Sequence, residues 1–222
     1  MTAYRGRPPA PAAVPPPGAP DGPEPAASMP GRIREAWLDM PGSTRRLLAE
    51  NPSEGRLLVY VIASDMVFFL SWALKTLLAP TAAAAAALPL HIGLWLIAAL
   101  LLRTLSLYAF AALARIVGRA FGGTGSWREV RAGVFWGALV AAPFGLLAAL
   151  LGLAVAAAEP AHPFLGAPVF ALPPYYIGLV PFLWFVAAGL ATAHGFARGA
   201  WTFLALSTGT VALSLAGVYL SG

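Results

Sequence analysis

The chain has 222 residues, of which 59% are hydrophobic and only 10% are charged. A soluble domain normally carries about a quarter charged residues, so this composition excludes an ordinary soluble protein and indicates an integral membrane protein. The net charge of +5 does not predict nucleic-acid binding, because the arginines lie at the ends of apolar runs, where membrane topology explains them. The chain has no cysteine, which excludes disulfides and thiolate metal sites.

Residues 1–31 form a tail rich in Pro, Ala and Gly that contains nearly half of the 21 prolines. The tail has almost no large apolar residues, so it cannot bury enough surface to offset the entropy lost on ordering, and we expect it to be disordered. It also lacks the apolar core of a signal peptide, so we expect no cleavage. Binding of a partner by the tail in the polyproline II conformation is an open alternative.

Residues 32–50 form a short amphipathic region. Ile33, Ala36, Trp37 and Met40 recur at helical spacing, and charged residues occupy the opposite side. We expect an interfacial helix that lies along the membrane surface, with its arginines toward anionic lipid headgroups. A helix that docks on a partner is the alternative.

Five apolar segments follow, each long enough to cross a bilayer. They are expected at residues 57–79, 89–117, 127–157, 174–193 and 201–220. The predicted fold is therefore all-α, a polytopic bundle of five transmembrane helices over residues 51–222. Asn51 is expected to be the N-cap of the first span, with Pro52 at its first helical position.

The connection between the second and third spans is a glycine-rich hinge. Gly122, Gly123 and Gly125 can adopt positive φ at little steric cost, so they are expected to end one helix and turn the chain. Ser126 and Glu129 have the spacing of a capping box, which predicts a new helix directly after Ser126. The GGTGS run lacks the lysine and the strand context of a phosphate loop, so we expect no nucleotide binding.

The basic residues predict the orientation of the bundle. All but two of the 14 lysines and arginines lie in the N-terminal region, around the hinge, or between the fourth and fifth spans. Positively charged loops are retained on the cytoplasmic side of a membrane, so the N-terminus should be cytoplasmic and the C-terminus periplasmic. Lys75 is the only lysine, a bias typical of GC-rich bacteria, which suggests a bacterial inner membrane. The predicted cytoplasmic basic face consists of Arg45, Arg46, Arg115, Arg119, Arg128 and Arg131.

Asp65 lies deep inside the first span and Arg103 near the middle of the second. An isolated charge there costs about 2.5–3.5 kcal/mol on insertion scales, so Asp65 and Arg103 need an explanation. The spans are antiparallel, and helical rise places both residues at similar depth, which predicts an intramembrane ion pair. A proton or ion relay is the functional alternative. Lys75 is expected to extend to the outer interface.

The third span carries small residues at every fourth position, a spacing that lets helix backbones approach closely in a membrane. Packing against another span of the same chain is the simpler interpretation, and a homodimer face is the alternative. Pro143 is expected to kink this helix. The residues of the stripe are Gly133, Gly137, Ala141 and Gly145.

Three features together resemble the Yip domain family, the five-span membrane proteins that interact with Ypt/Rab GTPases, and its bacterial relatives. They are RRLLAENPSEGRLLVYV before and within the first span, the hinge GGTGSW followed by arginines, and Pro143. The resemblance covers about residues 43–220 and implies five spans with the N-terminus inside. The family is linked in eukaryotes to vesicle trafficking and membrane shaping. A bacterial member has no Rab partner, and the family supplies no catalytic residues.

These observations predict a non-enzymatic membrane scaffold or adaptor without catalytic, cofactor or metal sites. It would bind anionic lipid, or an unidentified membrane or cytoplasmic protein, through its basic face. The alternative is a small transporter, or an accessory subunit of a membrane complex, that uses Asp65 and Arg103.

Overall fold

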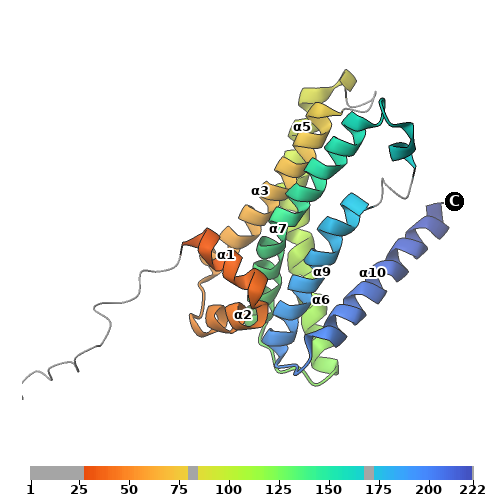
Figure 1. The fold of residues 1–222 in the computed structure, drawn as a ribbon. Helices are drawn as coiled ribbons and strands as arrows, with labels where there is room; N and C mark the ends of the chain where they lie inside the picture. Colours follow the sequence, from red (N-terminus) through yellow and green to blue (C-terminus); the bar gives the residue numbers. More distant parts are fainter. Residues whose placement is uncertain (1–27, 80–84, 168–172, 222) are drawn as a thin grey trace, which may run out of the picture.

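The computed structural model describes residues 28–79, 85–167 and 173–221 of the chain (Figure 1). The elements formed by these residues are all helical. Five helices are long and apolar enough to cross a membrane, so this is a multi-pass helical membrane protein. Residues 1–27 of the tail that we expected to be disordered lie outside the described residues. Residues 29–31, which we also assigned to the tail, instead begin a helix, because the Ser28 hydroxyl accepts a hydrogen bond from the Gly31 amide.

The observed spans begin and end within three residues of the predicted ones. The first is α3 (Glu54–Leu78), the third α7 (Trp127–Ala158), the fourth α9 (Pro173–His194) and the fifth α10 (Gly199–Ser221). The second consists of α5 (Leu88–Ile97), a π-helical turn η1 (Ala98–Arg103) and α6 (Thr104–Ala120). A short 3-10 helix, η2 (Pro163–Gly166), follows α7.

The bundle has two ends, which we call the hinge end and the far end. The hinge end, lowest in Figure 1, holds the hinge at residues 121–126 and the turn at residues 195–198. The far end, at the top, holds the ends of α3 and α7 and the start of α5. Helix α10 lies at the edge of the bundle, mainly against α9.

Helix α7 is the centre of the bundle. It packs against α9, α3 and α6, and every residue from Val130 to Ala141 is buried. Tyr60, Phe135 and Trp136 are among the largest fully buried side chains. They lie in the first half of α3 and α7, so the half of the bundle nearer the hinge end has a solid aromatic core.

Two short helices, α1 (Met29–Leu38) and α2 (Met40–Ala49), form an N-terminal pair beside this core (Figure 1). They do not lie free along the membrane surface as expected. Ala36, Met40 and Leu47 belong to the same buried cluster as α7. The Trp37 indole N–H donates to the carbonyl of Val140 at 2.9 Å. Ala36 and Met40 of the apolar stripe are therefore buried inside the protein, whereas Trp37 stays 42% exposed.

A second contact joins α2 to the core. The indole N–H of Trp136 donates to the hydroxyl of Ser43 at 3.1 Å, which satisfies two buried polar groups. Small residues on this face of α2, including Gly42 and Thr44, are also buried and let the helix lie close to the bundle.

The start of α3 differs from the prediction. Asn51 is not its N-cap: Asn51 has φ +48°, and its amide donates to the Leu48 carbonyl at 3.0 Å, so it turns the chain at the end of α2. Asparagine tolerates this left-handed conformation better than most residues. Ser53 caps α3 instead, accepting a hydrogen bond from the Arg56 amide at 3.2 Å.

Glu50 links the N-terminal pair to the bundle through two ion pairs. Its carboxylate lies 3.0 Å from Arg32 on α1 and 2.6 Å from Arg56 on α3. Partial burial alone would raise the pKa of Glu50, but the hydrogen bonds and charges of Arg32 and Arg56 together lower it below its ordinary value of 4.5.

Acid should therefore weaken the attachment of the N-terminal pair. A carboxylate whose pKa is lowered by folding stabilises the fold above its unfolded pKa, and this contribution is lost as pH falls through the folded pKa. Hydrogen exchange of residues 29–49, corrected for intrinsic rates, should accelerate between about pH 5 and about pH 3. Glu50→Gln should exchange faster already at neutral pH and respond little to acid. An unchanged acid response in Glu50→Gln would contradict this assignment.

Candidate functional site

A polar cluster lies within the membrane-spanning region between α3 and the second span. Arg103 donates through Nη1 to Oδ1 of Asp65, and Thr104 donates to the other carboxylate oxygen. Arg103 Nη2 also donates to the Ser64 hydroxyl at 3.1 Å, and Ser64 donates to the carbonyl of Ala138 on α7 at 3.2 Å. Asp65 is fully buried. The two residues that the sequence analysis paired are thus in contact.

The local sequence places both halves of this cluster. Asp65 follows Ser64 on α3, while Arg103 ends the π-helical turn and Thr104 begins α6. A π-helical turn is wider than an α-helical turn, so it changes the direction in which the following side chains point. The Arg103 guanidinium also lies 5.0 Å from the centre of the Phe68 ring. Each acidic oxygen has a donor, so the cluster holds the second span against α3.

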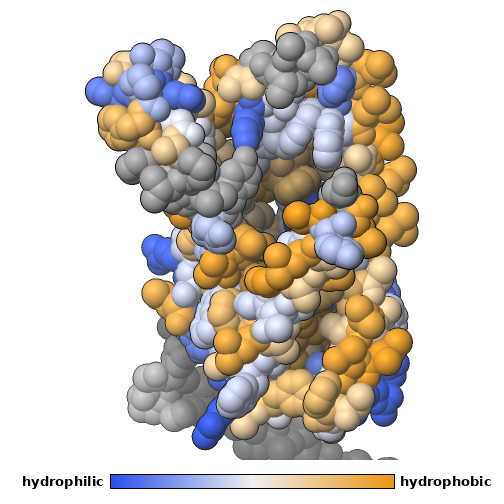
Figure 2. Space-filling view, turned by 90° about the vertical axis from the view of Figure 1, so that its right-hand side faces the viewer, coloured by the Kyte–Doolittle hydropathy of each residue, from blue (hydrophilic) through white to orange (hydrophobic). Residues whose placement is uncertain are grey.

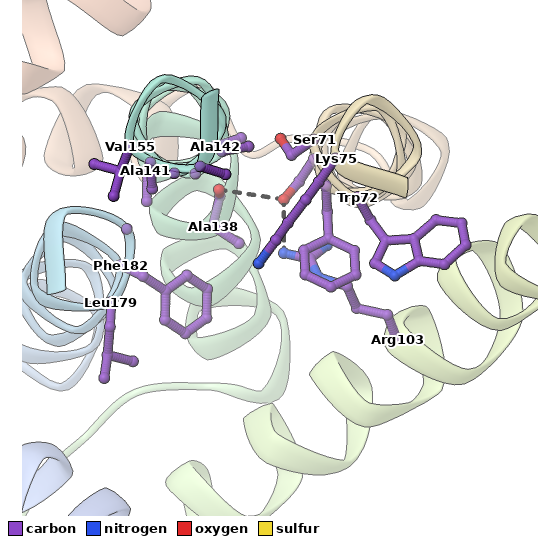
Figure 3. Close-up of a pocket in the computed structure, with 18 of the residues that line it drawn as sticks. Ser71, Trp72, Lys75, Arg103, Ala138, Ala141, Ala142, Val155, Leu179 and Phe182 are labelled. Carbon is purple, nitrogen blue, oxygen red and sulfur yellow. Dashed lines mark hydrogen bonds between the residues drawn. The ribbon is translucent and has the colours of Figure 1, made fainter. Parts of the chain in front are cut away.

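A cavity of about 680 Å³ extends from this cluster toward the far end, between α3, η1, α7 and α9. Helix α3 contributes hydroxyls, aromatic rings and Lys75, whereas α7 contributes alanines, glycines and a valine. Glu159, which directly follows α7, and Leu165 and Gly166 of η2 also line the cavity. Leu179 and Phe182 of α9 line the opposite side (Figure 3). Lys75, which we expected to reach the outer interface, instead extends into this cavity (Figure 3).

The small-residue stripe of α7 has two different uses. At the hinge-end half it packs directly on the backbone of α9: a Cβ on Gly133 would lie 2.6 Å from the Gly189 carbonyl oxygen. A Cβ on Gly137 would lie 2.8 Å from the carbonyl oxygen of Phe185. Gly133 and Gly137 therefore pack against another span of the same chain, which was the simpler interpretation of the stripe.

Farther along α7, the stripe becomes the wall of the cavity. Ala141 and Gly145 both line it, and a Cβ on Gly145 would meet nothing within 4 Å. The same spacing of small residues therefore produces a tight helix contact in one half and an open surface in the other.

The hinge glycines are needed mainly for space. Only Gly122 has positive φ, at +85°, and the expectation for Gly123 and Gly125 was wrong in this respect. A Cβ on Gly123 would lie 2.4 Å from Nδ1 of His194, and a Cβ on Gly125 would lie 2.7 Å from the Ala193 carbonyl oxygen. The hinge thus packs on the end of α9. The capping box is present, with reciprocal hydrogen bonds between Ser126 and Glu129.

His194 is the important residue here that the sequence analysis did not connect with the hinge. Its side chain is only 3% exposed and stacks on Phe196. Gly118, two residues before the end of α6, also lies against it: a Cβ there would be 2.4 Å from Nε2. The glycines and the histidine belong to different connections, so the sequence alone does not show that they meet.

The predicted basic face divides into two groups. Arg46 pairs with Glu35 at 2.6 Å, Arg131 pairs with Glu54 at 2.7 Å, and Arg128 lies 3.6 Å from Glu54. Arg131 is only 9% exposed. Each of these three arginines thus has an acidic neighbour in the protein, and Arg128 and Arg131 share the carboxylate of Glu54.

The other group comprises Arg45, Arg115 and Arg119, for which the described part of the chain offers no ion pair within 4.0 Å. Arg45 lines a groove of about 400 Å³ at the hinge end, between α2, α9 and the start of α10. Arg45 and Arg119 thus remain exposed for external contacts.

Known proteins do not add to this geometry: no family model, no curated protein and no solved structure matches the chain. Within residues 28–79, 85–167 and 173–221, no group of three or more His, Asp or Glu residues is placed to hold a metal ion. The functional argument therefore rests on the arginines of the hinge end, the intramembrane polar cluster and the cavity.

Replacing a stripe glycine with leucine should destabilise the protein where the stripe packs on α9, but not where the stripe lines the cavity. Gly137→Leu should lower the thermal unfolding temperature in detergent, because its side chain must displace the α9 backbone, at a cost of typically about 1–3 kcal/mol. Gly145→Leu, which enters open space, should unfold within a few degrees of the unmodified protein. Equal destabilisation by both would contradict the assignment. Loss of a dimer without loss of folding in Gly137→Leu would instead indicate a homodimer face.

Proposed function

We propose that this protein is a non-enzymatic membrane scaffold or adaptor that binds an acidic cytoplasmic partner protein at its hinge end. The observation that carries the proposal is the docking of the N-terminal pair beside arginines that form no ion pair with any of the described residues. A docked pair of helices holds Arg45 in a fixed position relative to the bundle. Fixed positive charge favours both the rate and the specificity of association with an acidic surface.

The charge distribution supports a cytoplasmic position for the hinge end. Most of the arginines lie in the N-terminal pair, in the turn at residues 195–198, and at the ends of α6 and α7 next to the hinge. Arginines in such positions are retained on the cytoplasmic side of a membrane. The N-terminus would then be cytoplasmic and the C-terminus periplasmic, in a bacterial inner membrane. Anionic lipid headgroups would contact the same arginines at the membrane surface.

Membership of the Yip domain family is also part of this proposal. It is supported by five spans, by the capping-box hinge that precedes α7, and by Pro143 within α7. These are features of architecture, and the Rab-related functions of eukaryotic members are not carried over.

A small transporter, or an accessory subunit of one, is the second candidate, because the cavity reaches Arg103 in the membrane-spanning region. Fully buried Tyr60, Phe135 and Trp136 fill the bundle on the hinge side of the cavity. Transport would require these rings to move, whereas an adaptor needs no such movement. Proton-coupled flux that disappears in a stably folded Asp65→Asn variant would favour transport.

Crosslinking in cells, followed by purification in mild detergent and mass spectrometry, tests the adaptor proposal. We expect a foreign protein in stoichiometric amounts. Arg45→Gln should reduce its recovery several-fold. Arg46→Gln is the matched control, because it removes the same charge from the neighbouring residue, whose guanidinium already pairs with Glu35. Recovery of self-crosslinks alone, or equal losses in the two variants, would contradict the proposal.

A further inference from the structure

The groove beside Arg45, between α2, α9 and the start of α10, lies in the hinge-end half of the membrane. Helix α9 lines it from Trp184 to Thr192, which corresponds to about 12 Å of helix. Trp184 lies about 15 Å along the helix before the end of α9 at His194. Half of a bilayer's hydrocarbon core is also about 15 Å thick. The groove therefore occupies the depth of the hinge-end leaflet.

Most of the groove lining is apolar and borders a surface that faces lipid. Trp184 is half-exposed, Ala188 and Ala191 of α9 lie beside it, and Phe196 adds a ring from the turn. The neighbouring α10 has no buried residue in its most apolar stretch. Figure 2, which shows the side of the molecule that carries α10, presents mainly apolar and weakly polar residues between the two ends. Acyl chains are thus the groups that surround this part of the protein.

The charge of the groove is positive and has no acidic neighbour in the lining. Among the described residues that line the groove, Arg45 is charged and none is acidic. Arg45 forms no ion pair with any of the described residues. The carboxylate of Asp39, at the start of α2, caps that helix by accepting the Gly42 amide at 2.9 Å. Arg198 is exposed in the turn that lines the groove and adds a second positive charge nearby.

A lipid fits this groove better than a segment of a cytoplasmic protein does. A polypeptide would carry backbone N–H and C=O groups to the depth of the hydrocarbon core, where no water satisfies them. An acyl chain has no such groups. The volume of about 400 Å³ lies within the range of pockets that hold small organic ligands. An amphiphile with an apolar chain and an anionic headgroup therefore matches the groove in shape, depth and charge.

We propose that this groove binds one anionic phospholipid of the hinge-end leaflet, with its phosphate at Arg45 and one acyl chain along α9 as far as Trp184. The inference deepens the proposed function, since it rests on the contact of anionic headgroups with the hinge-end arginines and gives one lipid a defined site. The lipid phosphate and a carboxylate of the protein partner would be alternative occupants of Arg45. The lipid would therefore compete with the partner.

Native mass spectrometry of the purified full chain, titrated in detergent with dioleoyl phosphatidylglycerol, tests the headgroup assignment. We expect one tightly bound lipid per chain, with an affinity at least about tenfold higher than that for dioleoylglycerol, which has the same chains and no phosphate. Arg45→Gln should remove most of this difference, because it removes the charge that pairs with the phosphate. Arg119→Gln is the matched control, since Arg119 is also exposed but does not line the groove. Equal affinities for the two lipids, or equal losses in the two variants, would overturn the proposal.

A pair of tryptophan variants tests the position of the acyl chain. Trp184→Ala should weaken the binding of phosphatidylglycerol several-fold, because it removes the ring that the chain contacts. Trp201→Ala is the matched control, since Trp201 is an exposed ring on α10 that does not line the groove. Thermal unfolding in detergent shows whether both variants are folded. If Trp184→Ala is not, Ala200→Leu, which narrows the groove at an exposed position, should weaken binding instead. Unchanged binding in a folded groove variant would overturn the chain assignment.

These outcomes are separate from those of the adaptor proposal, because the purified protein contains no partner. Loss of partner recovery in Arg45→Gln without any preference for phosphatidylglycerol would leave the adaptor proposal standing and overturn the lipid site. A preference for phosphatidylglycerol without a foreign partner in cells would support the lipid site alone. Partner recovery that depends on Trp184, without lipid binding, would identify the groove as a protein-docking site and overturn the lipid assignment.

Discussion

The contact between the backbones of α7 and α9 is the constraint on which the rest of the structure depends. Gly133 and Gly189 meet so closely that a Cβ on Gly189 would lie 2.3 Å from the Gly133 carbonyl oxygen. Lipid chains are as apolar as leucine, so close packing of this kind, rather than the hydrophobic effect, holds membrane helices together. It makes α7 the central helix, and the aromatic core and the N-terminal pair assemble around it.

The polar cluster complements this contact from the other side of α7. Asp65 and Arg103 join the second span to α3, and Ser64 joins α3 to the Ala138 carbonyl. Breaking a buried pair by removing one partner typically costs about 3–5 kcal/mol, so the cluster also fixes the relative depth of the first two spans. Near the hinge end, the glycines of α7 and α9 and the aromatic core therefore pack the helices closely together. Beyond the polar cluster, the helices stand farther apart and surround a cavity.

This division gives the two halves of the bundle different capacities. The hinge end is solid, carries fixed arginines and holds the N-terminal pair, which suits association with a protein. The far half contains the cavity, into which Lys75 extends and which Glu159 also lines. Helices α7 and α9 take part in both halves.

Local patterns in the sequence predicted much of the fold. The spans, the capping box at Ser126 and the pairing of Asp65 with Arg103 all depend on hydropathy, helical spacing or the high cost of an isolated charge in lipid. Each of these constraints acts within one or two neighbouring elements.

The features that the sequence did not predict depend on contacts between distant segments. The amphipathic stripe of residues 32–50 does not specify whether it faces lipid or α7. The hinge glycines do not specify that His194 of another connection lies against them. The cavity depends on how far apart three helices stand, which no single segment determines.

The most direct test of the central claim uses the absence of native cysteine. A Cβ on Gly178 of α9 would lie 3.5 Å from the Cβ of Ala148 on α7, a separation that a disulfide can bridge. Oxidation of Ala148→Cys/Gly178→Cys should therefore form a disulfide within one chain, seen as a faster-migrating monomer on non-reducing gels, and neither single variant should form it. Disulfide-linked dimers alone, or no disulfide at all, would contradict the packing of α7 on α9 within the same chain.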